Sequence, residues 1–186
     1  MAEKLIVLHA DDKPDWLDNV ANQLKTLKIR GRPREVIVLS RVSVAEARDL
    51  LDGEDKQMQS LAADGHRLAA VIIDLMMGGG KMQEVERWLT GIRSMRTTKT
   101  GADLPSPAFQ EFDNMCPTAQ IGRKARKVGV PVVILTNVSK FMPAKELSLA
   151  AERKLIMTAC GASQYIVKTD GNWPKQLNSA LETLIS

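Results

Sequence analysis

Residues 71–82 read VIIDLMMGGGKM, an apolar run that ends in one carboxylate, Asp74, and continues into a glycine-rich turn and a lysine. The run is rich in Val and Ile and is continuous rather than alternating. This pattern is typical of a strand that is covered on both faces, and therefore of a parallel sheet. Runs of the same kind stand at four other places, which makes five expected strands: LIVL (5–8), VIVL (36–39), AAVII (69–73), VPVVIL (130–135) and QYIV (164–167).

Amphipathic stripes with helical spacing separate these strands. They are centred on Trp16, on the segment 44–51, on Trp88, on Leu155 and on Leu177, and Pro14 stands where the first helix is expected to begin. Strands that alternate with helices predict an α/β fold with a doubly wound, five-stranded parallel sheet. We expect the flavodoxin-like strand order 2-1-3-4-5 in a single domain over residues 1–186.

The connection between Asp74 and Thr136 is much longer than the roughly 30 residues that a βαβ unit needs. We place a long insertion at about 97–129 in this crossover. Its first part, 97–122, shows no sustained period and holds three prolines. A loop of this kind is usually functional or disordered.

The composition excludes several classes of protein. No apolar run approaches the roughly 20 residues of a membrane span, and no signal peptide is present. Two cysteines without CxxC spacing indicate reduced thiols and a cytoplasmic protein. The net charge is +4, and residues 81–129 hold nine Lys or Arg against five Asp or Glu, so the rest of the chain is balanced. The basic cluster RKARK (123–127) has no aromatic platform beside it, so we do not expect nucleic acid as a partner.

Polar residues follow the expected strands where each strand ends. Asp11 and Asp12 follow the first strand, Asp74 the third, Thr136 the fourth and Lys168 the fifth. Because ligands of open parallel sheets bind at the carboxyl ends of the strands, we expect these side chains to converge. Three clustered carboxylates need a cation among them, and a hard divalent ion such as Mg²⁺ prefers oxygen ligands. His9 also stands at the end of the first strand, where we expect it to pack rather than to bind.

The glycine run is not a phosphate-binding P-loop. The pattern GxxxxGK[ST] would need glycine at Leu75 and a hydroxyl residue at Met82. We therefore interpret Gly78, Gly79 and Gly80 as a turn that leads into the next helix.

The set Asp11-Asp12, Asp74, Thr136 and Lys168, together with GASQYIVK (161–168), resembles the receiver domain of two-component response regulators over nearly the whole chain. The resemblance implies that Asp74 accepts a phosphoryl group from a sensor histidine kinase or phosphotransfer protein. It also implies an Mg²⁺ ion held by Asp11, Asp12, Asp74 and the backbone carbonyl of Met76. Lys168 and Thr136 would contact the phosphoryl group, and Tyr165 would act as a switch.

The family pattern implies no enzyme activity beyond self-phosphorylation and autodephosphorylation on Asp74, and output through contacts with a downstream protein. Two departures concern the switch: Thr169 stands where the family usually has proline, and Asn137 where a small residue is usual. Two alternatives stay open. One is a receiver-like interaction module that acts without phosphorylation. The other is an Mg²⁺-dependent phosphohydrolase, which is disfavoured because Met76 stands where a general-acid aspartate is needed.

Overall fold

The structure is a computed structural model that describes residues 4–94, 106–142 and 147–185. Its core is a sheet of parallel strands in the order β4-β1-β5-β6-β7. Among the sheet strands alone this order is 2-1-3-4-5, which confirms the predicted doubly wound, flavodoxin-like α/β fold. The strands are β1 (Leu5–Ala10), β4 (Val36–Arg41), β5 (Arg67–Ile73), β6 (Val132–Thr136) and β7 (Gln164–Val167).

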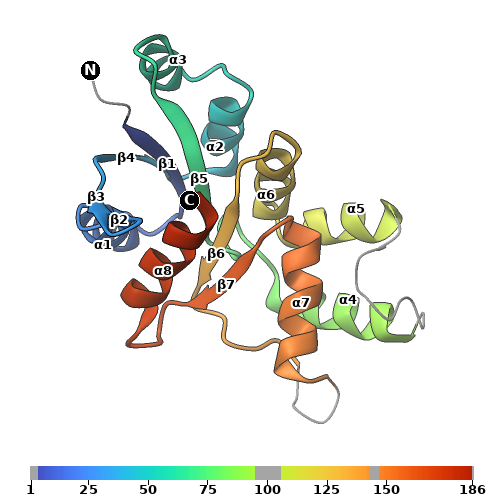
Figure 1. Cartoon of the computed structure of the whole chain (residues 1–186). Helices are drawn as coiled ribbons and strands as arrows, with labels where there is room; N and C mark the ends of the chain where they lie inside the picture. Colours follow the sequence, from blue (N-terminus) through green and yellow to red (C-terminus); the bar gives the residue numbers. More distant parts are fainter. Residues whose placement is uncertain (1–3, 95–105, 143–146, 186) are drawn as a thin grey trace.

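The interior strand β1, which lies between β4 and β5, shows why the apolar runs are continuous. All of its residues are buried, and alternate side chains enter different cores. Leu5 and Val7 pack with α1 (Pro14–Leu24) and α8 (Trp173–Ile185) on one face of the sheet. Ile6 and Leu8 belong to the larger core on the other face, with α2 (Val44–Leu51), α6 (Thr118–Lys127) and α7 (Leu149–Cys160). Figure 1 shows these two helical layers on either side of the strands.

Local sequence signals set the helix starts correctly in two cases. The helix α1 begins at Pro14, as predicted, and α2 spans the segment 44–51 that the stripe indicated. Ser43 caps α2, since its side chain accepts a hydrogen bond from the backbone N–H of Glu46 at 3.2 Å. A cap of this kind satisfies one of the backbone N–H groups that the first turn of a helix leaves without a partner.

The stretch 97–122, which shows no sustained period and was expected to be a loop, is largely helical in its described part, so the loop prediction was wrong there. The structure has α5 (Ser106–Met115) and then α6 in this region, and residues 95–105 lie outside the described residues. The helix that covers the sheet in this crossover is α6, whereas α4 (Met82–Ser94) packs with α5 in a lobe beside it (Figure 1). Trp88 of α4 joins the two helices. Its ring lies 4.6 Å from that of Phe112, and its Nε1 donates to the carbonyl of Ala108 at 3.0 Å.

Three short elements were not predicted: α3 (Lys56–Ala63) and the two strands β2 (Lys28–Ile29) and β3 (Arg32–Pro33), which pair as an antiparallel hairpin.

Within the described ranges, no helix is long and apolar enough to cross a bilayer. Cys116 and Cys160 are both free and buried.

Candidate functional site

The sheet itself delivers the site residues to one edge, because backbone pairing continues one residue beyond the strands. The N–H of Asp74 donates to the carbonyl of Ala10 at 2.9 Å. The N–H of Lys168 donates to the carbonyl of Thr136 at 2.8 Å. The side chains that follow β1, β5 and β7 therefore leave the sheet at the same level and meet.

An acidic cluster forms where β1 and β5 end. One carboxylate oxygen each from Asp11, Asp12 and Asp74 lies within 4.8 Å of the others. Asp11 is fully buried, Asp74 is 7% exposed and Asp12 faces solvent. Oδ1 of Asp74 is buried and accepts no hydrogen bond from the residues that the structure describes. Oxygen donors of this kind, one of them unsatisfied, fit a hard divalent cation.

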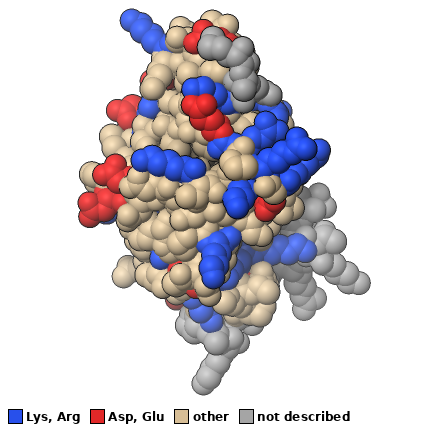
Figure 2. Space-filling view, turned by 60° about the vertical axis from the view of Figure 1, so that its left-hand side comes forward, with Lys and Arg blue, Asp and Glu red and all other residues tan. Residues whose placement is uncertain are grey.

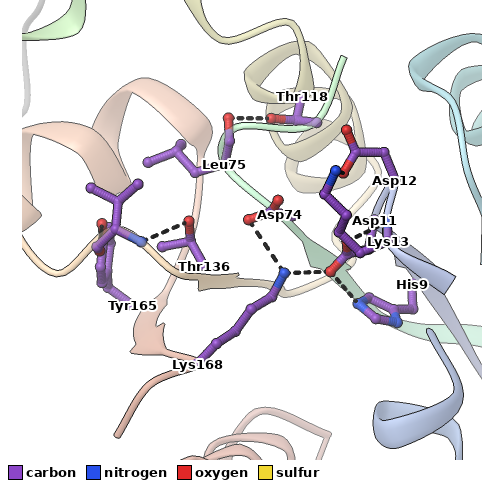
Figure 3. Close-up of polar contacts among 11 residues, drawn as sticks. His9, Asp11, Asp12, Lys13, Asp74, Leu75, Thr118, Thr136, Tyr165 and Lys168 are labelled. Atoms are coloured by element: carbon purple, nitrogen blue, oxygen red, sulfur yellow. Dashed lines mark hydrogen bonds and ion pairs between the residues drawn. The ribbon is translucent and has the colours of Figure 1, made fainter. Parts of the chain in front are cut away.

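Lys168 provides the positive charge inside the cluster. Its side chain is fully buried, and its Nζ lies 2.5 Å from Oδ2 of Asp11 and 3.5 Å from Oδ1 of Asp74. Figure 3 shows the amino group between these two carboxylates. The amino group also lies over the ring of Trp16, 5.1 Å from its centroid. This cation–π contact was not foreseen from the sequence.

The electrostatics of Asp74 follow from this packing. Burial raises the pKa of Asp74 above its usual range, and the charges of Asp11 and Asp12 act in the same direction. Lys168 and the hydroxyl of Thr136 oppose the rise but do not cancel it. A bound cation would favour the ionised carboxylate, which is the form that acts as a nucleophile.

Thr136 and Tyr165 are connected through one residue of the loop after β6. The N–H of Val138 donates to Oγ1 of Thr136 at 3.3 Å, and the carbonyl of Val138 accepts from the Tyr165 hydroxyl at 2.7 Å. Tyr165 therefore lies behind Thr136 as seen from Asp74, and Figure 3 shows it away from the carboxylates. Burial raises the pKa of Tyr165 well above its usual range, so its hydroxyl stays a donor.

His9 is packed, as expected, but it is not satisfied. It is fully buried, and neither ring nitrogen has a hydrogen-bond partner among the described residues. Its Nε2 lies 3.7 Å from Oδ2 of Asp11. Burial, with a smaller effect from Lys168, lowers the pKa of His9 to about 3, so this contact joins a neutral ring to a carboxylate and is not an ion pair.

The loop after Asp74 is held at two points. Thr118, which opens α6 and is fully buried, donates from Oγ1 to the carbonyl of Leu75 at 3.1 Å. The N–H of Gly80 donates to the carbonyl of Met76 at 3.2 Å, which leaves one lone pair of that carbonyl free for a cation. Gly78 and Gly79 have φ angles of 75° and 84°, so the glycine run is a turn, as the sequence indicated. Thr118 was missed because its partner lies far away along the chain.

The two departures from the family pattern leave the cluster assembled. The side chains of Asn137 and Thr169 are exposed. No peptide bond in the described ranges is cis, so the bond between Lys168 and Thr169 is trans. Lys168 points into the cluster nevertheless, because its backbone is paired with β6.

No protein-family model matches the chain, and a search of curated proteins finds no match either. Among solved structures, the chemotaxis protein CheY4 of Vibrio cholerae is similar at 18% identity, with a TM-score of 0.43 over 98% of this chain and 99% of that one. The signal receiver domain of an HD domain-containing protein from Pseudomonas fluorescens Pf-5 is similar at 15% identity, with a TM-score of 0.49 over 100% of this chain and 89% of that one. At this level of likeness, the assignment of the fold rests on the strand order of the chain itself.

Proposed function

We propose that the chain is a receiver that accepts a phosphoryl group on Asp74 and passes the signal on through protein contacts. The observation that carries this proposal is the convergence of Asp74 with two further carboxylates and with the buried amino group of Lys168. The donor would be a phosphohistidine of a sensor kinase or phosphotransfer protein in the cytoplasm. The flavodoxin-like fold agrees with this reading, because receiver domains share it.

Each residue of the cluster has its own role in the transfer of the phosphoryl group to Asp74. A carboxylate oxygen of Asp74 attacks the phosphorus atom, the P–N bond of the phosphohistidine breaks, and its electrons stay on the imidazole nitrogen. The product is an aspartyl phosphate, a mixed anhydride that water later hydrolyses. The amino group of Lys168 moves from Asp11 towards the phosphoryl oxygens. The hydroxyl of Thr136 donates a hydrogen bond to one of these oxygens. Asp11, Asp12, Asp74 and the Met76 carbonyl would hold Mg²⁺, which when bound supplies charge neutralisation at this edge.

The test is phosphorylation by a small phosphodonor such as acetyl phosphate in the presence of Mg²⁺, followed by intact mass measurement. We expect the wild type to gain the mass of one phosphoryl group and to lose it again on standing. Asp74→Asn should gain nothing, and the matched variant Asp113→Asn, whose carboxylate pairs with Arg123 away from the site, should behave as the wild type.

Two outcomes would contradict the proposal. An unmodified wild type in saturating Mg²⁺ and phosphodonor would favour an interaction module that acts without phosphorylation. Steady turnover of a phosphomonoester, lost in Asp74→Asn, would favour a phosphohydrolase instead.

A further inference from the structure

The β2–β3 hairpin is a small, well-defined ribbon between α1 and β4. Ile29 pairs with Arg32 across a two-residue loop, in which Arg30 has a φ of 52° and Gly31 a φ of 72°. Positive φ at both loop positions is the geometry of a type I′ turn. Arg30 is the only described residue other than glycine with positive φ. An arginine is an uncommon choice there, because a side chain in this region costs free energy.

The hairpin is anchored to the body of the protein rather than free. Ile29 is 6% exposed and packs in the same core as Leu24 and Leu27. The N–H of Arg34 donates to the carbonyl of Leu27 at 3.1 Å, which closes the base of the ribbon. With its base packed and its tip fixed by the turn, the ribbon holds its outer side chains in a set arrangement.

Those outer side chains are basic. Five cationic residues in and beside the hairpin are exposed: Lys25, Lys28, Arg30, Arg32 and Arg34. We call these five residues the basic hairpin. Figure 2, which brings this side of the molecule forward, shows Lys and Arg side chains gathered on it.

The charges of the basic hairpin are not neutralised within the part of the chain that the structure describes. None of the five forms an ion pair there, and Lys25 donates only to the side-chain amide oxygen of Asn22. The cluster RKARK differs, because Arg123 pairs with Asp113 and Lys124 with Asp52. The net charge of the sequence did not reveal this difference, because the hairpin belongs to the residues outside 81–129, whose positive and negative charges are equal in number. Among the described residues, the basic hairpin therefore holds five cations without an ion pair, whereas RKARK holds two, Arg126 and Lys127.

We propose that the basic hairpin binds the phosphate backbone of duplex nucleic acid. The guanidinium group of arginine can donate two parallel hydrogen bonds to the oxygens of one phosphate. The major groove of duplex DNA is wide enough to admit a two-stranded β-ribbon. The exposed part of the ribbon consists of cations, Gly31 and Pro33, and its apolar residue, Ile29, is turned inward. It therefore lacks the apolar residues that insert into a membrane and the aromatic anchors that dominate protein interfaces.

The position of the hairpin makes this binding separate from the chemistry of Asp74. The hairpin leads directly into the start of β4, whereas the acidic cluster lies where the parallel strands end. Binding should therefore be equal in wild type and Asp74→Asn, and a failure of the phosphorylation test would leave this proposal standing.

The test measures fluorescence anisotropy of a labelled DNA duplex two helical turns long, titrated with the full chain at several salt concentrations. The variant Arg30→Asn/Arg32→Gln/Arg34→Gln removes three charges, and asparagine is a preferred residue for the turn. The control Arg126→Gln/Lys127→Gln/Lys154→Gln removes three exposed charges elsewhere. At about 50 mM salt we expect the hairpin variant to bind roughly tenfold to hundredfold more weakly, with a salt slope smaller by about 3 units, because each phosphate contact contributes about 0.9. The control should bind within about twofold of wild type.

Three results would overturn the proposal. One is an equal loss in the control variant, which would mean that only net charge matters. Another is the absence of salt-dependent binding by the wild type at about 50 mM salt. The third is tighter binding to polyglutamate or to phosphatidylserine vesicles than to the duplex, which would assign the surface to an acidic protein or a membrane. Unchanged thermal unfolding of both variants excludes misfolding as the cause of a loss.

Discussion

At the scale of single residues, His9 is the least expected member of the site. A buried imidazole without hydrogen-bond partners costs free energy, and this one stands next to the carboxylate that Lys168 contacts. Its neutral form is the only one that the buried position accepts, because burial and Lys168 both lower its pKa. His9 therefore places a neutral polar ring behind Asp11 without adding charge.

This predicts a specific dependence of stability on pH. The pKa of His9 is about 3 in the folded protein, against 6.5 for an unperturbed histidine. Between these values the unfolded chain binds a proton that the folded chain does not. The free energy of unfolding should therefore fall with falling pH below about 6.5, by up to about 1.4 kcal/mol per pH unit for this group. In urea denaturation without metal, His9→Val should lose this contribution between about pH 6.5 and pH 4.5.

The control for this measurement is His66→Gln, which removes the other, partly exposed histidine and leaves His9 in place. Asp74, with its raised pKa, acts in the opposite sense, since its contribution is present at low pH and is lost as the pH rises through its folded-state pKa. Asp74 is present in all three proteins, so its effect cancels in the comparison. An identical slope in wild type and His9→Val would contradict the burial argument.

Lys168 gives a second prediction at this scale. Lys168→Met leaves Asp11 and Asp74 buried without their shared cation. At neutral pH and without metal, we expect the free energy of unfolding to fall by about 3–5 kcal/mol, the usual result of breaking a buried ion pair. Mg²⁺ should restore part of this loss and should bind the variant more tightly than the wild type, because the lysine no longer competes for Asp11. Denaturation with EDTA and with Mg²⁺ measures both effects.

Lys13→Met is the matched control, since the Lys13 side chain is 67% exposed and its Nζ lies 3.9 Å from Asp12 at the rim. Its unfolding free energy should change by less than about 0.5 kcal/mol. Weaker Mg²⁺ binding in Lys168→Met than in wild type would show that the lysine supports the ion rather than competing with it.

At the scale of elements, the sequence predicted which helix faces are buried better than it predicted the elements on which those faces pack. The stripe around Trp88 correctly indicated a buried helix face, but α4 packs on α5 through Phe112 rather than covering the sheet. The helix that does cover the sheet, α6, buries mainly small residues such as Ala119, Gly122 and Ala125, so its buried face holds few of the large apolar side chains that marked the other stripes. Periodicity reports burial and not the partner, so the crossover was assigned to the wrong helix.

The site was more predictable than the crossover for a physical reason. Asp11, Asp74 and Lys168 follow strands directly, so parallel pairing alone brings them together. The contacts of Thr118 with Leu75 and of Trp16 with Lys168 depend on where helices sit, which no short pattern specifies.

The small residues of α6 predict a strict requirement at Gly122. A Cβ at this position would lie 2.1 Å from the backbone carbonyl oxygen of Cys160 at the end of α7. Because backbone cannot rotate away as a side chain can, Gly122→Ala should separate α6 from α7 and lower the free energy of unfolding by about 3 kcal/mol. Gly91→Ala is the matched control, since Gly91 also lies within a helix but its Cβ would meet no atom of the described residues within 4 Å.

Chemical denaturation of Gly122→Ala and Gly91→Ala measures the change in the free energy of unfolding that each substitution causes. Gly91→Ala should be neutral or stabilising by up to about 1 kcal/mol, because alanine is the better helix former. Equal effects in the two variants would mean that the close approach of α6 and α7 relaxes without cost.

At the scale of the whole molecule, the acidic cluster exists only when the sheet is assembled. Its carboxylates come from the ends of β1 and β5, and the lysine that neutralises them comes from the end of β7. In the unfolded chain these groups are far apart, so a divalent cation should bind the folded state alone. Metal binding and folding are then linked by mass action.

We therefore expect Mg²⁺ to stabilise the whole protein and not only the loop after Asp74. At a concentration of about 100 times the dissociation constant, the free energy of unfolding should rise by about 2.7 kcal/mol, and EDTA should reverse the gain. Asp12→Asn removes one carboxylate that is exposed and so changes the packing least, and it should shift the response to higher Mg²⁺. Asp52→Asn removes a carboxylate that pairs with Lys124 outside the site, and it should respond as the wild type does. Thermal unfolding across a Mg²⁺ series gives the answer: a flat series, or the same response in Asp12→Asn as in wild type, would mean that the three carboxylates do not act as one cation site.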